Sequence, residues 1–136
     1  MIKEIIKDEA FLAQVAEPAT PEDVSVGDDL IDTLKAHQHE CVGLAANMIG
    51  VNKSIIAFNN EGYFWVMFNP EIIKTNKEYK VMEGCMSLDG KREATRYKTI
   101  KVRFQMKDFS SHTMVFKGYT AQIIQHEIDH TKGILI

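Results

Sequence analysis

Hydrophobic residues recur at helical spacing in two parts of the chain. Leu30, Ile31 and Leu34 share one face if the segment is helical, and two aspartates precede them, so we expect a helix over about 28–39. A second pattern predicts a helix over about 119–132, because five residues at offsets of 0, 4, 7, 8 and 11 would form one stripe facing the core: Tyr119, Ile123, His126, Glu127 and His130. Gly133 suits the position just after the end of that helix.

Between these helices, runs of β-branched and aromatic residues indicate strands. They are expected at 54–58, 63–68, 72–82, 98–106 and 113–117. Residues 17–29 are rich in turn-forming residues and are expected to form an irregular surface stretch. Since no repeat or linker interrupts the chain, residues 1–136 are expected to form one domain of the α+β class, with antiparallel β-sheets packed around a C-terminal helix.

Charge and cysteine content narrow the class of protein. The formal net charge is -3, which argues against a dedicated nucleic-acid binder because such proteins usually carry a basic excess. No apolar run is long enough to cross a bilayer, and the charged N-terminus does not fit a signal peptide, so no membrane association is expected. Cys41 and Cys85 are too few for a disulfide framework, which favours reduced thiols in the cytoplasm.

The segment His126–His130 has the pattern of a helical metal site. Two histidines at i and i+4 lie roughly 40° apart around a helix, so both imidazoles can reach one cation, and Glu127 can reach a water bound to it. Surface histidines could produce the same pattern by chance. However, three ionisable groups on a core-facing stripe need a compensating partner, and a metal ion supplies one.

The third ligand is expected upstream of the helix. Only residues 131–136 follow His130, and none of them is a His, Cys, Asp or Glu. Cys85 is favoured because a thiolate with two imidazoles leaves the fourth position open for water. The competing candidates are Cys41, His37, His39 and His112.

Three segments of the chain resemble the signature segments of peptide deformylases, in the same order. They are Cys41–Gly50, Glu83–Leu88 and His126–His130. The resemblance implies a metal-dependent hydrolase that removes the N-formyl group from the N-terminal methionine of newly made polypeptides. It also implies that one divalent ion is held by Cys85, His126 and His130, natively Fe²⁺, with Zn²⁺, Ni²⁺ or Co²⁺ able to substitute.

The resemblance further implies roles for the residues around the metal. Glu127 would carry the proton from the attacking water to the leaving amine, and the backbone N–H of Met86 would hold the formyl oxygen. Arg96 would orient Asp129 from behind the ligands. The peptide backbone would pair with the strand around Val42, Gly43 and Leu44, while the methionine pocket and its rim would include Tyr119, Gln122, Ile123 and Arg92.

The chain departs from the family pattern at two places in the first segment. Met48 stands where the family has a glutamine that donates a hydrogen bond to the formyl oxygen, and Cys41 replaces the first glycine. Losing one oxyanion donor typically costs about 3 kcal/mol, or roughly 10²–10³ in rate. One reading is therefore a working but slower deformylase. The alternatives are a metal- and peptide-binding relative with little catalysis, or a generic HExxH metallopeptidase.

The expected partners are N-formylmethionyl nascent peptides. Seven lysines and arginines gather in residues 91–107. Docking near ribosomal RNA at the peptide exit is one interpretation of them, but solvated strand faces are the favoured explanation.

Overall fold

Five antiparallel strands form one sheet in the order β1-β2-β3-β4-β5. The computed structural model describes residues 1–136. The strands are β1 (Gly43–Ala45), β2 (Ile55–Asn60), β3 (Tyr63–Cys85), β4 (Leu88–Gln105) and β5 (Ser111–Lys117). Each strand pairs with its neighbour in the sequence, so the sheet is a simple meander with β1 and β5 at its edges.

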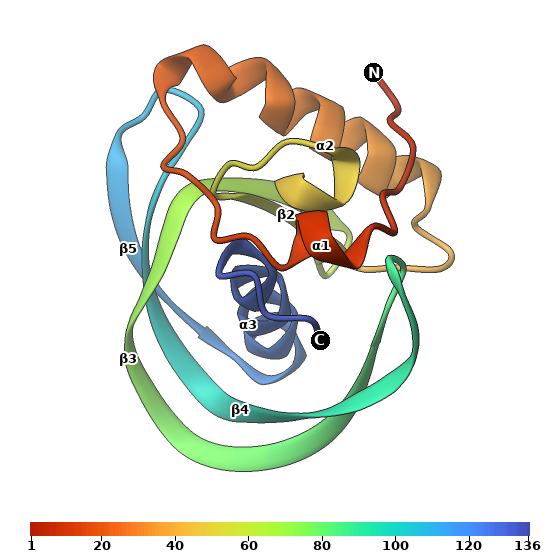
Figure 1. The fold of residues 1–136 in the computed structure, drawn as a ribbon. Helices are drawn as coiled ribbons and strands as arrows, with labels where there is room; N and C mark the ends of the chain where they lie inside the picture. The colour runs from red at the N-terminus through yellow and green to blue at the C-terminus, as the bar shows by residue number, and fades with distance from the viewer.

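The two long central strands bend around the C-terminal helix. The first part of β3 pairs with β2, and the rest pairs with β4 as far as Cys85. The register of β3 with β4 shifts between Phe68 and Glu71 and again between Ile72 and Lys74. Because such irregularities bend and twist a strand, β3 and β4 sweep around α3 in Figure 1.

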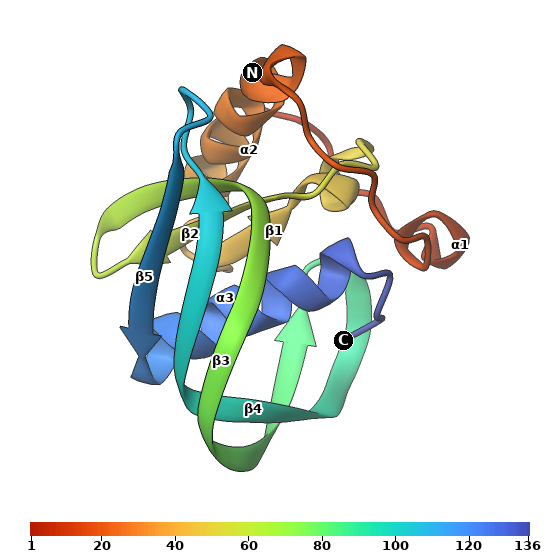
Figure 2. The same cartoon turned by 90° about the vertical axis from the view of Figure 1, so that its left-hand side faces the viewer.

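Helices lie on both sides of this curved sheet. They are α1 (Glu9–Leu12), α2 (Val24–Ala36) and α3 (Gly118–Thr131), with short 3₁₀ turns η1 (Pro21–Asp23) and η2 (Ala46–Ile49). β5 leads directly into α3, which crosses behind β3, β4 and β5 in Figure 2. None of these helices has the length and apolar character needed to span a membrane.

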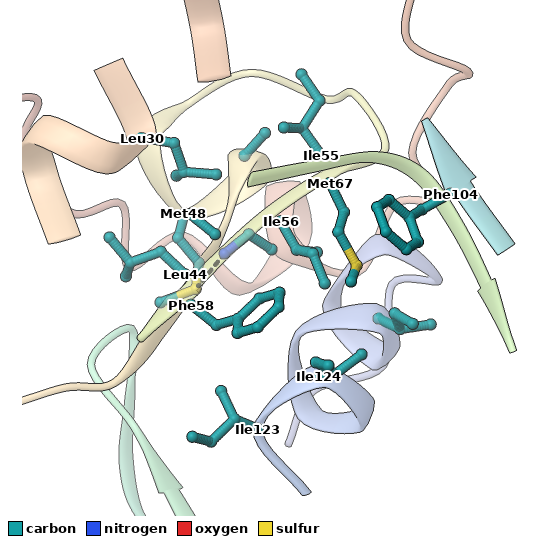
Figure 3. Packing of buried hydrophobic residues seen from close by; sticks show 14 of the residues in the cluster. Leu30, Leu44, Met48, Ile55, Ile56, Phe58, Met67, Phe104, Ile123 and Ile124 are labelled. Carbon is teal, nitrogen blue, oxygen red and sulfur yellow. Dashed lines mark hydrogen bonds between the residues drawn. The ribbon is translucent and has the colours of Figure 1, made fainter. Parts of the chain in front are cut away.

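One apolar cluster joins α2, the sheet and α3. Leu30 and Leu34 of α2 are fully buried against strand residues, and Ile124 of α3 closes the cluster from the other side. Figure 3 shows this arrangement, with Phe58 and Met67 of the sheet between the two helices. The cluster holds α3 firmly in the concave side of the sheet, so side chains that leave this helix are positioned by the core.

The predicted fold class, an α+β domain with antiparallel strands around a C-terminal helix, is confirmed. α3 ends at Thr131, and Gly133 adopts a φ of 75°. The N–H of Gly133 bonds to His130 and that of Ile134 to Asp129, which is the Schellman pattern expected after a helix. A Cβ at Gly133 would also lie 2.4 Å from the carbonyl oxygen of Ala13.

The helix predicted over 28–39 is α2, which begins and ends earlier than expected, at Val24 and Ala36, and residues 17–29 are only partly irregular. The N–H of Thr20 donates to the Asp23 carboxylate at 2.8 Å, and Pro21 opens η1, which runs straight into α2. A proline at the first position is preorganised for a helix. Part of this turn-forming segment therefore begins a helix, although an irregular stretch was expected over 17–29.

Candidate metal centre

Three ligand atoms converge between α3 and the end of β3. The Nε2 atoms of His126 and His130 lie 3.1 Å apart, and the Cys85 Sγ lies 3.3 Å from the Nε2 of His130. All three atoms lie within 4.8 Å of one another. Cys85 reaches this position because it is the last residue of β3, and only two residues separate it from the start of β4.

The donor set fits a divalent transition metal. Tetrahedral coordination by one thiolate and two imidazoles separates the ligand atoms by roughly 3.3–3.6 Å, close to the observed spacing. Both histidines are buried, so water cannot readily satisfy their ring nitrogens. The Nε2 of His130 faces both other ligand atoms, and a cation satisfies all three lone pairs at once.

Glu83 and Arg96 hold the first histidine from behind. The Glu83 Oε1 lies 2.8 Å from the Nδ1 of His126, which leaves the Nε2 free to face the other ligands. Arg96 donates to both oxygens of Glu83, at 2.7 Å and 3.0 Å, and to Asp129 Oδ2 at 2.7 Å. The predicted contact of Arg96 with Asp129 is present. Glu83 was missed, although strand alternation places it on the same face as Cys85.

Charges in this network favour positive charge at the ligand cluster. Burial raises the pKa of Glu83, but hydrogen bonds from His126 and Arg96 outweigh it and lower the pKa to about 2. Burial lowers the pKa of His126, yet its hydrogen bonds with Cys85 and Glu83 raise the value to about 10. Burial and the nearby charge of His126 lower the pKa of His130 to about 3. The cluster thus stabilises one positive charge and rejects a second proton.

Glu127 stands beside the ligands as a buried carboxylic acid. Burial raises its pKa to about 7, and its Oε1 has no hydrogen-bond partner. A carboxyl group with a pKa near neutrality can both accept and release a proton, which is what a general acid–base catalyst requires. Gly43 makes room for this group, because a Cβ there would lie 2.8 Å from Glu127 Oε2 and 2.9 Å from Ile123.

A cavity of about 600 Å³ opens beside these groups. The predicted site residues that line it are Val42, Gly43, Met48, Cys85, Met86, Tyr119, Gln122, Ile123, His126 and Glu127. Other lining residues were not predicted as part of the site, because no motif or periodic pattern in the sequence marks them: Gln38, Glu40, Met82 and Lys91. His39, one of the competing candidates for the third metal ligand, is exposed and lines the cavity as well.

Two predicted side chains, those of Arg92 and Tyr119, lie differently from expectation. Leu44 was expected to pair with the peptide through its backbone, and its side chain is fully buried in the core because strand alternation turns it away from the cleft that Gly43 lines (Figure 3). Arg92 does not line the cavity; its guanidinium donates to the Asp89 carbonyl at 3.3 Å. Tyr119 was expected to face the core but is 64% exposed at the cleft.

Met48 turns its side chain inward from η2. It is 1% exposed, and its sulfur accepts a hydrogen bond from the Ala45 N–H at 3.4 Å, drawn as a dashed line in Figure 3. The side chain has no N–H or O–H to offer at the cleft. Cys41 also lines the cleft as a half-buried free thiol, and burial raises its pKa to about 12, which keeps it protonated.

A buried His₂Cys donor set with an adjacent carboxylic acid, on a helix inside a curved antiparallel sheet, defines a metal-dependent hydrolase. The family model "Polypeptide deformylase" matches residues 2–136, and the chain belongs to this family of metalloenzymes. This assignment supports deformylation and does not support the generic metallopeptidase alternative.

Individual relatives agree with this assignment. The chain is 52% identical to a peptide deformylase of Clostridium beijerinckii over 136 residues, covering 100% of both chains. It is 36% identical to one of Symbiobacterium thermophilum, covering 98% of this chain and 64% of that protein. Two solved structures are similar over 99% of this chain. One is a peptide deformylase of Acinetobacter baumannii with Met-Ala-Ser bound, with a TM-score of 0.88, 26% identity and 97% of that chain covered. The other is a peptide deformylase of Thermotoga maritima, with a TM-score of 0.88, 27% identity and 95% of that chain covered.

Proposed function

We propose that this protein removes the N-formyl group from the N-terminal methionine of newly synthesised polypeptides, using a divalent metal held by Cys85, His126 and His130. One observation carries the proposal: the three ligand atoms lie within 4.8 Å of one another, and the cavity that Cys85 and His126 line also holds Glu127. A divalent ion in this position would supply Lewis-acid activation of water near neutral pH.

Glu127 moves the proton in this mechanism. Its carboxylate takes a proton from the attacking water and delivers it to the amine that leaves from the formyl carbon. A pKa of about 7 suits both halves of this task, because the group can change protonation state near the working pH. Gly43 keeps the backbone far enough away for the carboxylate to hold this position.

The developing charge on the formyl oxygen is held by fewer donors than the family pattern provides. The backbone N–H of Met86, in the two-residue turn after Cys85, is one donor. Met48 supplies none. We therefore expect slower deformylation than in a relative that has the glutamine, since a single oxyanion donor typically stabilises the transition state by about 3 kcal/mol.

The peptide lies along the open side of β1. This strand is at the edge of the sheet, and Val42 and Gly43 line the cleft. Pairing through backbone groups reads little sequence, which suits a substrate class that shares only its first residue. The methionine side chain fits between Tyr119, Gln122 and Ile123. The solved neighbour with Met-Ala-Ser bound supports this substrate class.

Fe²⁺ is the native ion that we propose for this site, and Zn²⁺, Ni²⁺ or Co²⁺ can occupy the same donor set and support activity. A ferrous ion beside a thiolate is easily oxidised, so we place the protein in the reducing cytoplasm, near the ribosomal exit where N-formylmethionyl chains emerge.

Formate release from formyl-Met-Ala-Ser tests the proposal. The iron-loaded protein should release formate, chelation should abolish the activity, and reloading with iron should restore it. Cys85→Ala is the matched variant, because it removes one ligand and should lose both metal and turnover. Metal binding without any formate release by the wild-type protein would instead support a binding protein with little catalysis, the alternative that Met48 favours.

A further inference from the structure

A chain of hydrogen bonds extends from the ligand cluster to Tyr79 on β3. Gln122 Nε2 donates to Glu83 Oε2 at 2.9 Å, and the Tyr79 hydroxyl donates to Gln122 Oε1 at 3.3 Å. Glu83 in turn holds His126 Nδ1 through its other oxygen. We infer that Gln122, supported by Tyr79, is a positioning residue that aims His126 at the metal through Glu83. This inference rests on the proposed function only in requiring that His126 binds a metal.

The Glu83 carboxylate needs a fixed orientation to do this. Its terminal torsion is soft, so the groups that bond to its two oxygens set its orientation. Arg96 contacts both oxygens and His126 contacts Oε1, which leaves Gln122 as the only contact to Oε2 besides Arg96. With Gln122 in place, the carboxylate plane is held from two sides and Oε1 stays opposite the imidazole. Groups of this kind set the ring orientation of a ligand histidine.

Tyr79 supports the orientation of the Gln122 amide that Glu83 requires. The carboxylate can only accept, so the NH₂ group faces it, and the Tyr79 hydroxyl donates to the amide oxygen on the other side. The opposite orientation would place two acceptors against each other. Tyr79 is itself held in place: it lies opposite Arg96 in the β3–β4 register, and the Lys98 Nζ lies 4.1 Å from the centre of its ring.

Gln122 also lines the cleft, so it could act simply as a wall of the side-chain pocket. The two roles differ in what they change. A positioning residue alters metal affinity in the absence of any peptide, whereas a pocket wall alters KM and substrate preference and leaves metal affinity unchanged.

The test compares Zn²⁺ dissociation constants, measured by competition with a chromogenic chelator. Gln122→Leu keeps a side chain of similar size and removes the donor, and its Kd should rise about ten-fold, the lower end of the range for such partners. Tyr79→Phe removes only the hydroxyl and should raise Kd by a smaller factor in the same direction. Tyr119→Leu is the matched control, because Tyr119 lines the same cleft without bonding to Glu83, and its Kd should stay that of the wild type.

A Gln122→Leu Kd within about two-fold of the wild type, with a changed KM for formyl-Met-Ala-Ser, would overturn the inference and leave Gln122 as a pocket wall. If Gln122→Leu does not fold, as judged by thermal unfolding, Tyr79→Phe decides, and an unchanged Kd there overturns the inference as well. No substrate enters the Kd measurement. A wild-type protein that binds zinc but releases no formate would therefore contradict the proposed function and leave the inference about Gln122 unaffected.

Discussion

Met48→Gln tests how far the missing oxyanion donor limits the reaction. Met48 is 1% exposed and lines the cleft, and its sulfur already accepts from the Ala45 N–H at 3.4 Å. Glutamine has nearly the same length, so its Oε1 can accept the same N–H while its NH₂ group turns toward the cleft. The added donor should increase kcat/KM by up to about 10²–10³, equivalent to roughly 3 kcal/mol.

The same substitution should also lower stability. The new amide is buried and only partly hydrogen-bonded, which costs about 1–3 kcal/mol of unfolding free energy. Met48→Leu is the control, since it is buried and offers no donor. Formate release is measured with all three proteins at equal iron content. If Met48→Gln is no faster than Met48→Leu, the formyl oxygen is already fully stabilised and the reasoning about Met48 fails.

Three other substitutions probe the site and its support. Gly43→Ala places a Cβ 2.8 Å from the Glu127 carboxylate. The kcat should fall by about 10²–10⁴ with little change in Tm. An unchanged kcat would mean that the new methyl group does not disturb Glu127. Gly133→Ala combines a φ of 75° with a clash against the backbone of Ala13. Urea unfolding should show a decrease of roughly 2–4 kcal/mol in the free energy of unfolding. A decrease below about 1 kcal/mol would contradict this prediction. Arg96→Leu removes the guanidinium that bonds to both oxygens of the buried Glu83 and to Asp129, and should cost about 3–5 kcal/mol of unfolding free energy. A neutral result would mean that stability does not depend on this ion pair.

The metal ligands could be predicted because their chemistry depends on short spacings. The i and i+4 histidines share a helix face whatever surrounds them, and the stripe with Ile123 predicted that this face is buried. Gly133 was predicted as the helix end for a similarly local reason. Cys85 was only favoured among several candidates, since its approach to the helix depends on the length and curvature of β3.

The rest of the site depends on contacts that the sequence does not display. Glu83 and Arg96 are 13 positions apart and meet because β3 and β4 pair across the hairpin. Gln122 joins them only because α3 lies in the concave side of the sheet. The early start of α2 was missed for another reason. Turn-forming residues such as Pro21 serve both loops and helix starts, so composition alone did not separate the two.

Glu127→Gln tests the central claim most directly. The glutamine keeps the size of the side chain and cannot carry the proton, so metal content should remain that of the wild type while formate release from formyl-Met-Ala-Ser falls by about 10²–10⁴. That result would establish Glu127 as the proton carrier of a metal-dependent deformylase. Formate release at the wild-type rate by the metal-loaded variant would contradict the account.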